Sequence, residues 1–418
     1  MIEIKKLNSG IKVVIEEIPY IKSVSFGIWV KNGSKYENND NNGISHFIEH
    51  LIFKGTYKRN SKDIAEEMDK LGGQINAYTT KEYTCYHTRI LNKHFEKAVE
   101  ILSDMFLNSK FDNNDIKKEK NIILEEIYMY NDSPEELVHD KLQEAIWKND
   151  SIGLPILGTE NTINKFNQKN IKEYFKEHYI NNNIVISIAG NIEKEKAFDI
   201  LEKYFVNKNF KVNKKNLLIP KPTYIPSFIK NEKDSEQTHI CICFPSFERD
   251  SKYKYDITVL NNILGASMSS ILFQKIREEN GLTYSIYSYI SSYEDTGIFI
   301  IYASINPNQI EKVLNLIYKE INIIKKEKIS KKIIDKTKQQ IISNYIIGNE
   351  STINRMTSSG GSLLLRNYIP TEDEILENIE NVNPESIQNI TNKIFDFKNI
   401  SISLAGNTNN IKFSKIIP

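Results

Sequence analysis

Residues Gly43–Phe53 read G-I-S-H-F-I-E-H-L-I-F and contain the pattern H-x-x-E-H at positions 46–50. Two histidines four residues apart share one face of an α-helix, so His46 and His50 are predicted to lie one above the other. Such a pair can offer two imidazole nitrogens to one tetrahedral Zn²⁺ ion. Glu49 flanks the same face, where its carboxylate can take a proton from water activated by the metal rather than bind the metal.

The alternative for this pattern is two surface histidines on an amphipathic helix, without a function. The surrounding residues weigh against it, because they make the helix apolar on most sides and predict its burial: Phe47, Ile48, Leu51, Ile52 and Phe53. Polar groups buried without partners cost several kcal/mol, so this His and Glu cluster favours a metal site. The order H-x-x-E-H is that of the inverted zinc-protease motif.

Length and composition exclude several other classes of protein. The 418 residues fit two or more domains, and the net charge of +1 gives no indication of a nucleic-acid partner or a membrane surface. No run of 18 apolar residues predicts a spanning helix, and residues 1–7 lead directly into structure without a targeting segment. Cys85, Cys241 and Cys243 form no C-x-x-C pair, and the last two alternate along an apolar run, as on one face of a strand in a reducing compartment. We therefore expect a cytoplasmic protein.

An internal repeat organises the chain. Residues 186–191, I-S-I-A-G-N, recur as I-S-L-A-G-N at 402–407, a displacement of 406 − 190 = 216 residues. Lys-, Asn- and Pro-rich sequence between the copies predicts a linker. We expect two similar α+β domains, each a mainly antiparallel sheet packed with helices, at 1–210 and 227–418, joined by a linker at 211–226. The second domain has Leu260–Gly265 where the motif should recur, so it is expected to lack metal chemistry.

A catalytic zinc usually has three protein ligands, so one more residue is needed. The predicted helix after Asp112 offers Glu119, Glu125 and Glu126. Positions 119 and 126 are two turns apart and share a face, whereas Glu125 points about 100° away from Glu126. The alternative is that these acids are simply solvated, and the spacing alone leaves the role of Glu126 open.

With these residues the chain resembles the pitrilysin-type (M16) metallopeptidases, specifically the short bacterial members similar to the mitochondrial processing peptidase. In that family a ligand Glu follows 76 residues after the second His of the motif, and here 126 − 50 = 76. The resemblance implies that His46, His50 and Glu126 bind Zn²⁺ and that Glu49 is the general base. It also implies that Glu119, seven positions before the ligand, orients one of the ligands.

The resemblance covers nearly the whole chain, including residues 153–159. Residues 72–79 resemble a family strand whose edge pairs with the substrate backbone, which implies substrate binding by Asn76, Ala77 and Tyr78. Residues 269–284 imply that Arg277 and Tyr284 reach the active site, grip substrate carbonyls and stabilise the oxyanion. The alternative for this pair is a surface Arg and a core Tyr. One departure is L-G-A-S at 264–267, where many relatives have a longer glycine run.

The implied function is a zinc-dependent endopeptidase that hydrolyses peptides or unfolded segments. Long family members enclose a chamber with four such domains, so a chain with two is expected to form a dimer, as a homodimer or as a heterodimer with a related chain. Arg277 and Tyr284 would then come from the partner chain. The alternatives are a non-catalytic structural subunit or a partner subunit of the same fold, although such subunits typically lose the motif.

Overall fold

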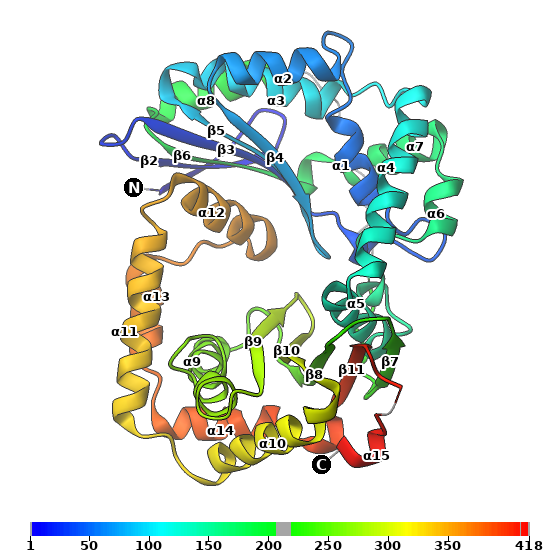
Figure 1. The fold of residues 1–418 in the computed structure, drawn as a ribbon. Helices are drawn as coiled ribbons and strands as arrows, with labels where there is room; N and C mark the ends of the chain where they lie inside the picture. The colour runs from blue at the N-terminus through cyan, green and yellow to red at the C-terminus, as the bar shows by residue number, and fades with distance from the viewer. Residues whose placement is uncertain (1, 206–218, 410, 417–418) are drawn as a thin grey trace. The chain divides into compact units, whose positions relative to one another are not determined.

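The computed structural model describes residues 2–205, 219–409 and 411–416, which form two compact units (Figure 1). The first unit comprises Met1–Ile127, Leu154–Ile219 and Ile346–Ile369, and the second comprises Tyr128–Gly153, Pro220–Tyr345 and Pro370–Pro418. We predicted continuous domains at 1–210 and 227–418, and this division stays a prediction. The compact units are not continuous, because residues 128–153 belong to the second unit and residues 346–369 to the first. The predicted boundary at 210 and the linker residues 211–218 lie outside the described residues.

The first unit contains a six-stranded sheet in which all neighbours are antiparallel except β2 and β6. Its strands, in spatial order, are β1 Ile2–Lys6, β2 Lys12–Glu17, β6 Ile184–Gly190, β3 Ser23–Val30, β5 Thr84–Leu91 and β4 Gln74–Thr79. β1 and β2 form a hairpin whose turn contains Asn8-Ser9-Gly10, and Gly10 adopts a φ of 89° there. β4 is an edge strand, so one side of its backbone has no partner in this sheet.

Successive residues of a strand point to opposite faces of a sheet, and the apolar residues on both faces of this sheet are covered by helices. On one face the core contains Phe26 and Ile28 of β3 together with residues of four helices: α1 Ile44–Ile52, α2 Ser61–Lys70, α3 Phe95–Asn108 and α8 Lys194–Phe205. On the other face Trp29 packs against Met356 and Leu363 of α12 Thr352–Arg366. Figure 1 shows α12 on the side of the sheet opposite α3 and α8.

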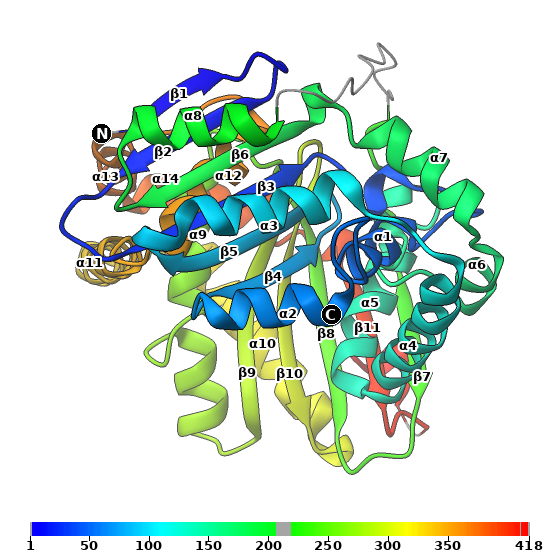
Figure 2. The same ribbon diagram turned by 90° about the horizontal axis from the view of Figure 1, so that it is seen from above.

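Three helices gather around α1 at one end of this sheet (Figure 2). They are α4 Asn113–Asp132, α6 Glu160–Lys165 and α7 Gln168–His178. The next helix, α5 Pro134–Ile146, begins with proline at its first position and is capped by the Ser133 hydroxyl.

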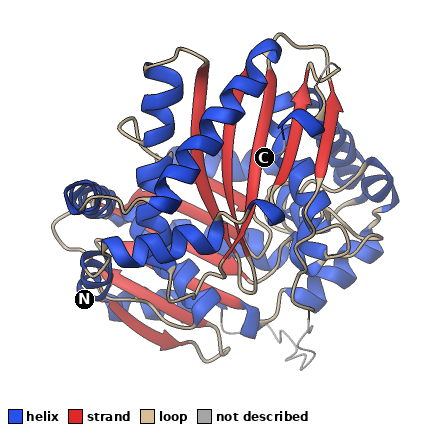
Figure 3. Cartoon of the chain, turned by 90° about the horizontal axis from the view of Figure 1, so that it is seen from below, coloured by secondary structure: helices blue, strands red, loops and turns tan. Residues whose placement is uncertain are grey.

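The second unit contains a five-stranded sheet whose strand order and directions match those of the first sheet without β1. Its order is β7 Phe228–Glu232, β11 Ser401–Gly406, β8 Thr238–Ser246, β10 Gly297–Ile305 and β9 Thr283–Ser292, and only β7 and β11 are parallel. Figure 3 shows helices lying across these strands. The helices of this unit include α9 Lys254–Leu264, α10 Ile310–Lys326, α11 Lys331–Gly348, α13 Glu372–Glu380, α14 Pro384–Ile394 and α15 Phe413–Ile416, with a π-helical turn at Phe273–Glu278.

Two helices, α5 and α12, each pack on the sheet formed by the other half of the sequence. α5, from the first half, packs its residues Leu142 and Ile146 on the face of the second sheet that carries Cys241 and Cys243, while α12, from the second half, covers the first sheet. The cysteines lie on one strand face and are free, as predicted. The α+β class is confirmed, and within the described residues no helix has the length and apolar character needed to cross a bilayer.

Candidate metal centre

The H-x-x-E-H stretch forms α1, as the sequence predicts, and the helix is buried on most sides. Phe47, Ile48 and Ile52 are fully buried in the core of the first unit. His46 and Glu49 are 8% and 9% exposed, so these polar groups lie in a largely dry environment, while His50 is partly exposed.

The side chains of α1 and α4 converge at one point. Nε2 of His46 lies 3.9 Å from Glu126 Oε2, and Nε2 of His50 lies 3.7 Å from the same oxygen. The ligand atoms of all three residues lie within 4.8 Å of one another, and no other such group of His, Cys, Asp and Glu occurs in the part of the chain that the structure describes. Glu126 of α4 therefore faces the two histidines of α1.

The three residues fit a zinc ion. Separations of 3.7 and 3.9 Å are too long for hydrogen bonds, and a tetrahedral Zn²⁺ with bonds of about 2.1 Å sets its ligand atoms about 3.4 Å apart. Burial, with the neighbouring His50, lowers the pKa of His46 to about 3, so the imidazole is neutral and keeps a lone pair for a metal. Two imidazoles and a carboxylate are a usual set for catalytic zinc.

Glu119 contacts one of these histidines. Its Oε2 lies 3.1 Å from His50 Nδ1, and its Oε1 accepts from Lys54 Nζ at 2.9 Å. Burial by itself would raise the pKa of Glu119, but the hydrogen bonds from His50 and Lys54 outweigh it and lower the pKa. A carboxylate at this position favours the His50 tautomer with its proton on Nδ1, which leaves the Nε2 lone pair for a metal.

Glu49 is held by a residue that the sequence reasoning missed. The Thr79 hydroxyl, at the end of β4, donates to Glu49 Oε2 at 2.6 Å. Burial raises the pKa of Glu49, although the Thr79 bond acts in the opposite direction. The only available signal was that Thr79 ends residues 72–79, the strand predicted to pair with the substrate backbone.

The predicted substrate strand is the edge strand β4, and β5 is its single neighbour in the sheet. Asn76 is exposed, and its side-chain oxygen accepts from the Ala77 N–H at 2.8 Å. The Tyr78 ring is partly buried and packs edge-on against Trp29, with centroids 6.3 Å apart. The edge is thus open at the backbone, while the Tyr78 ring belongs to the packing against α12.

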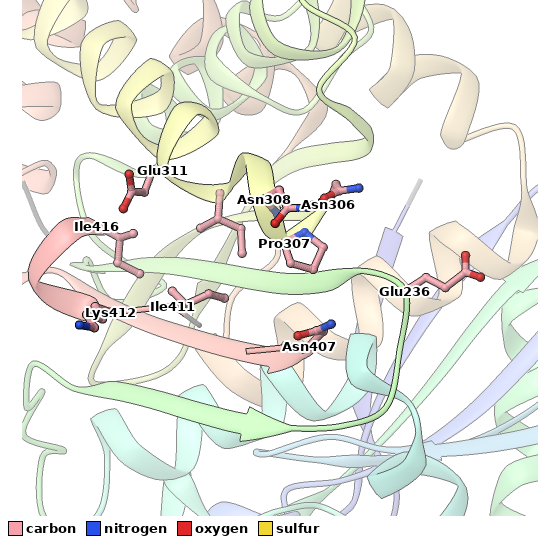
Figure 4. Close-up of a pocket in the computed structure, with 10 residues that line it drawn as sticks. Glu236, Asn306, Pro307, Asn308, Glu311, Asn407, Ile411, Lys412 and Ile416 are labelled. Carbon is pink, nitrogen blue, oxygen red and sulfur yellow. Dashed lines mark hydrogen bonds between the residues drawn. The ribbon is translucent and has the colours of Figure 1, made fainter. Parts of the chain in front are cut away.

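Arg277 and Tyr284 lie in the second unit, whereas the proposed ligands lie in the first. The Arg277 guanidinium carbon is 4.8 Å from the ring centroid of Phe273 and 4.8 Å from that of Tyr284, so it is held between two rings. Tyr284 is 78% exposed and is not a core residue. A separate pocket of about 420 Å³ in the same unit includes Glu236, Asn306 and Asn407 among its lining residues and contains none of the predicted site residues (Figure 4).

Two family models match successive parts of the chain. Residues 12–160 match the insulinase model of peptidase family M16, and residues 165–341 match the peptidase M16 inactive domain. The chain belongs to peptidase family M16. In this M16 protein, His46, His50 and Glu126 all lie within the segment that the first model matches, and none lies in the segment that the second model matches.

Relatives of this M16 chain support the assignment over nearly its full length. The chain is 40% identical over 97% of its length to an uncharacterised zinc protease, YmxG, of Bacillus subtilis, and it covers 99% of that protein. An uncharacterised zinc protease of Rickettsia felis is 37% identical, with 94% of each chain covered. A protease structure from Helicobacter pylori has the same fold, with a TM-score of 0.89 at 20% identity over 97% of this chain and 99% of that chain.

Proposed function

We propose that this M16 protein is a zinc-dependent endopeptidase that hydrolyses peptides or unfolded segments of proteins. The observation that carries the proposal is the convergence of His46, His50 and Glu126, with Glu49 beside them on α1. Zinc bound there would supply Lewis-acid activation of water and of the scissile carbonyl at neutral pH. A cytoplasmic location remains a prediction.

The residues of the chain then have separate tasks. Glu49 takes a proton from the attacking water and passes it to the leaving amine, and its raised pKa suits both steps. Thr79 holds Oε2 of Glu49, so we expect Oε1 to face the water. Glu119 keeps His50 in one tautomer and orientation through the Nδ1 contact.

The open edge of β4 suits an extended substrate. A peptide that adds to this edge pairs through its backbone, so recognition at Asn76, Ala77 and Tyr78 would depend little on sequence. A folded protein has few extended segments with free backbone groups, which is why unfolded segments are the proposed substrates. The Ala77 N–H, now bonded to Asn76, would exchange that bond for one to the substrate.

We further propose that the protein works as a dimer, with a second copy or a related chain, and that Arg277 and Tyr284 reach the zinc site from the partner. The preformed stack of Arg277 between two rings would present its N–H donors to substrate carbonyls and to the oxyanion. Mixing an Arg277→Ala chain with a His46→Ala chain should restore one complete site. Absence of any recovered cleavage in the mixture would contradict supply from the partner.

The function is tested by Glu49→Gln, measured as turnover of an unstructured peptide together with zinc content. We expect kcat to fall by about 10³-fold while one zinc per chain is retained, because the amide cannot take a proton. Thr79→Val is the graded companion: it should lower kcat by about tenfold, equal to about 1.4 kcal/mol, without loss of zinc. Normal turnover of Glu49→Gln would show that Glu49 is not the base. A wild-type chain that holds zinc but cleaves no peptide would favour the structural or partner subunit.

A further inference from the structure

The metal-bearing helix α1 begins without a side-chain cap of its own. Its N-cap residue is Gly43, which has a φ of 91° and no side chain to accept hydrogen bonds. The first N–H groups of a helix lack partners within the helix, and leaving them unsatisfied in a buried place is costly. An acceptor must therefore come from elsewhere in the chain.

Glu37 supplies that acceptor. Its Oε2 accepts from the Gly43 N–H at 2.7 Å, and its Oε1 accepts from the Ser45 N–H at 2.8 Å. The Asn42 side-chain amide also donates to Oε2, at 3.0 Å. Glu37 is only 4% exposed, so these hydrogen bonds form away from competing water.

The surroundings leave the Glu37 carboxylate little freedom. The Asn42 amide also donates to the Pro155 carbonyl at 2.8 Å. A Cβ on Gly43 would come within 2.7 Å of the Leu157 carbonyl oxygen and of Gly158 Cα, so residues 155–158 close directly over the helix start. On the other side the Ser45 hydroxyl accepts from the Asn32 amide at 3.0 Å. Glu37 thus joins a tightly packed loop to the first turn of α1.

This first turn carries a proposed ligand, His46, whose ring packs edge-on against His50 but is not oriented by a hydrogen bond at Nδ1 from any described residue. The His50 ring is oriented by Glu119, and the Glu49 carboxylate is held by Thr79. In contrast, the buried Nδ1 of His46 has no hydrogen-bond partner among the described residues. The position of the His46 ring therefore depends on the backbone that carries it, and Glu37 binds the N–H of the residue just before it.

We propose that Glu37 is a positioning residue for the zinc site: by capping α1 from outside the helix, it sets the position of His46 and thereby the affinity for zinc. This inference rests on the proposed function, since it assumes that His46 is a ligand. The chemistry requires a carboxylate, because one group must accept two backbone N–H bonds and complement the positive end of the helix dipole. Glutamine offers a single acceptor oxygen and places an amide donor against an N–H.

The test is the zinc dissociation constant of the purified full chain, measured by competition with a chromophoric chelator. Glu37→Gln should weaken zinc binding by about 10- to 100-fold, the usual effect of removing a group that supports a ligand. Glu37→Asp keeps the charge but withdraws the carboxylate by one methylene, so it should lose less affinity than Glu37→Gln. In the Co²⁺-substituted protein, the visible absorption bands should change in Glu37→Gln, because they report the geometry around the metal.

Asp104→Asn is the matched control. Asp104 is also 4% exposed and also accepts three hydrogen bonds, from Thr56, Arg59 and Asn108, but on α3 rather than at the start of α1. It should bind zinc within about threefold of the wild type. Equal losses in Asp104→Asn and Glu37→Gln would overturn the proposal, because the effect would then be a general loosening of the unit.

Two further outcomes keep the inference separate from the proposed function. A wild-type chain that binds no zinc would contradict the proposed function itself. A wild-type chain that binds zinc, with folded Glu37→Gln binding it equally well, would overturn only the role of Glu37. If Glu37→Gln does not fold, Glu37→Asp decides: unchanged affinity and an unchanged Co²⁺ spectrum would contradict the proposal.

Discussion

The helices α1 and α9 each pack in the core of their own unit, yet among the described residues only α1 carries proposed metal ligands of the His pair type. Adding the displacement of 216 to positions 46, 49 and 50 gives Asn262, Gly265 and Ala266. α9 ends at Leu264, so the last two of these positions lie beyond the helix, whereas Glu49 and His50 lie within α1.

At the end of α9 the backbone packs closely against the strand β9. A Cβ on Gly265 would come within 2.5 Å of the Ser288 hydroxyl oxygen, and the Ser288 N–H donates to the Gly265 carbonyl at 3.1 Å. In the first unit, the neighbouring strand instead offers the Thr79 hydroxyl to the Glu49 side chain. The close contact at Gly265 therefore leaves little room for a side chain at this end of α9, and α9 itself contains no His or Glu.

The largest expected effect comes from exchanging residues between these two helices. His46→Asn places in α1 the residue found in α9, and we expect kcat/KM to fall by about 10³-fold or more with loss of tight zinc binding, since several kcal/mol of transition-state stabilisation depend on the metal. The reverse change, Asn262→His with Ala266→His, restores the i, i+4 spacing but not the helix. Metal analysis should find no second zinc in that variant.

Either of two results would contradict the difference in metal binding that we expect between α1 and α9. A second tightly held zinc in the Asn262→His, Ala266→His chain would show that spacing alone creates a site. Wild-type zinc affinity in His46→Asn would show that the ion is held by other residues.

A smaller effect is expected from the exchanged helices, which pack differently on their sheets. α5 packs on the second sheet through side chains such as Leu142, but α12 approaches the first sheet through Gly360, where a Cβ would lie 2.3 Å from Trp29 Nε1 and 2.6 Å from Ser187 Oγ. Trp29 donates to Ser187 at 2.7 Å, so a methyl group would disturb a buried hydrogen bond. Gly360→Ala should destabilise the protein by about 1–3 kcal/mol, seen as a lower Tm in calorimetry.

Gly361→Ala is the control for helix propensity. The closest atom to its added Cβ is 3.9 Å away, which is ordinary contact, and alanine favours a helix over glycine by about 1 kcal/mol. Its Tm should stay equal or rise. A similar decrease of Tm in both variants would contradict the close approach at Gly360.

The sequence predicted the parts of the site that depend on local periodicity. The spacing within α1 predicted that His46 and His50 share a face, because a helix fixes which residues lie together, whereas the spacing along α4 left the role of Glu126 open and only the family resemblance selected it. Thr79 and Glu37 were missed, since their contacts with Glu49 and Gly43 depend on how a strand and a loop pack against α1. The exchange of α5 and α12 was missed for the same reason: a helix pattern predicts an apolar face but not the sheet that it covers.

The smallest expected effect concerns the loss of stability of the first unit at acid pH. In the first unit Arg59 donates to Glu67 on α2 at 2.9 Å and to Glu100 on α3 at 2.6 Å. The hydrogen bonds from Arg59 and then Lys97 lower the pKa of Glu67 from 4.5 to about 2. Because the folded pKa lies below the ordinary one, the stabilisation is complete above about pH 4.5 and is lost as the pH falls towards 2.

Trp fluorescence can follow this loss in one unit, since Trp29 belongs to the first unit and Trp147 to the second. In a Trp147→Phe background, urea unfolding of the first unit should lose about 1–2 kcal/mol between pH 5 and pH 2 through Glu67, less than the full pKa shift implies because this side chain is 28% exposed. Glu67→Gln should remove that part of the pH dependence. Glu66→Gln, which changes a neighbour that is 52% exposed, should leave it in place. An unchanged acid dependence in Glu67→Gln would mean that other groups, and not the Arg59 network, control the response of the first unit to acid.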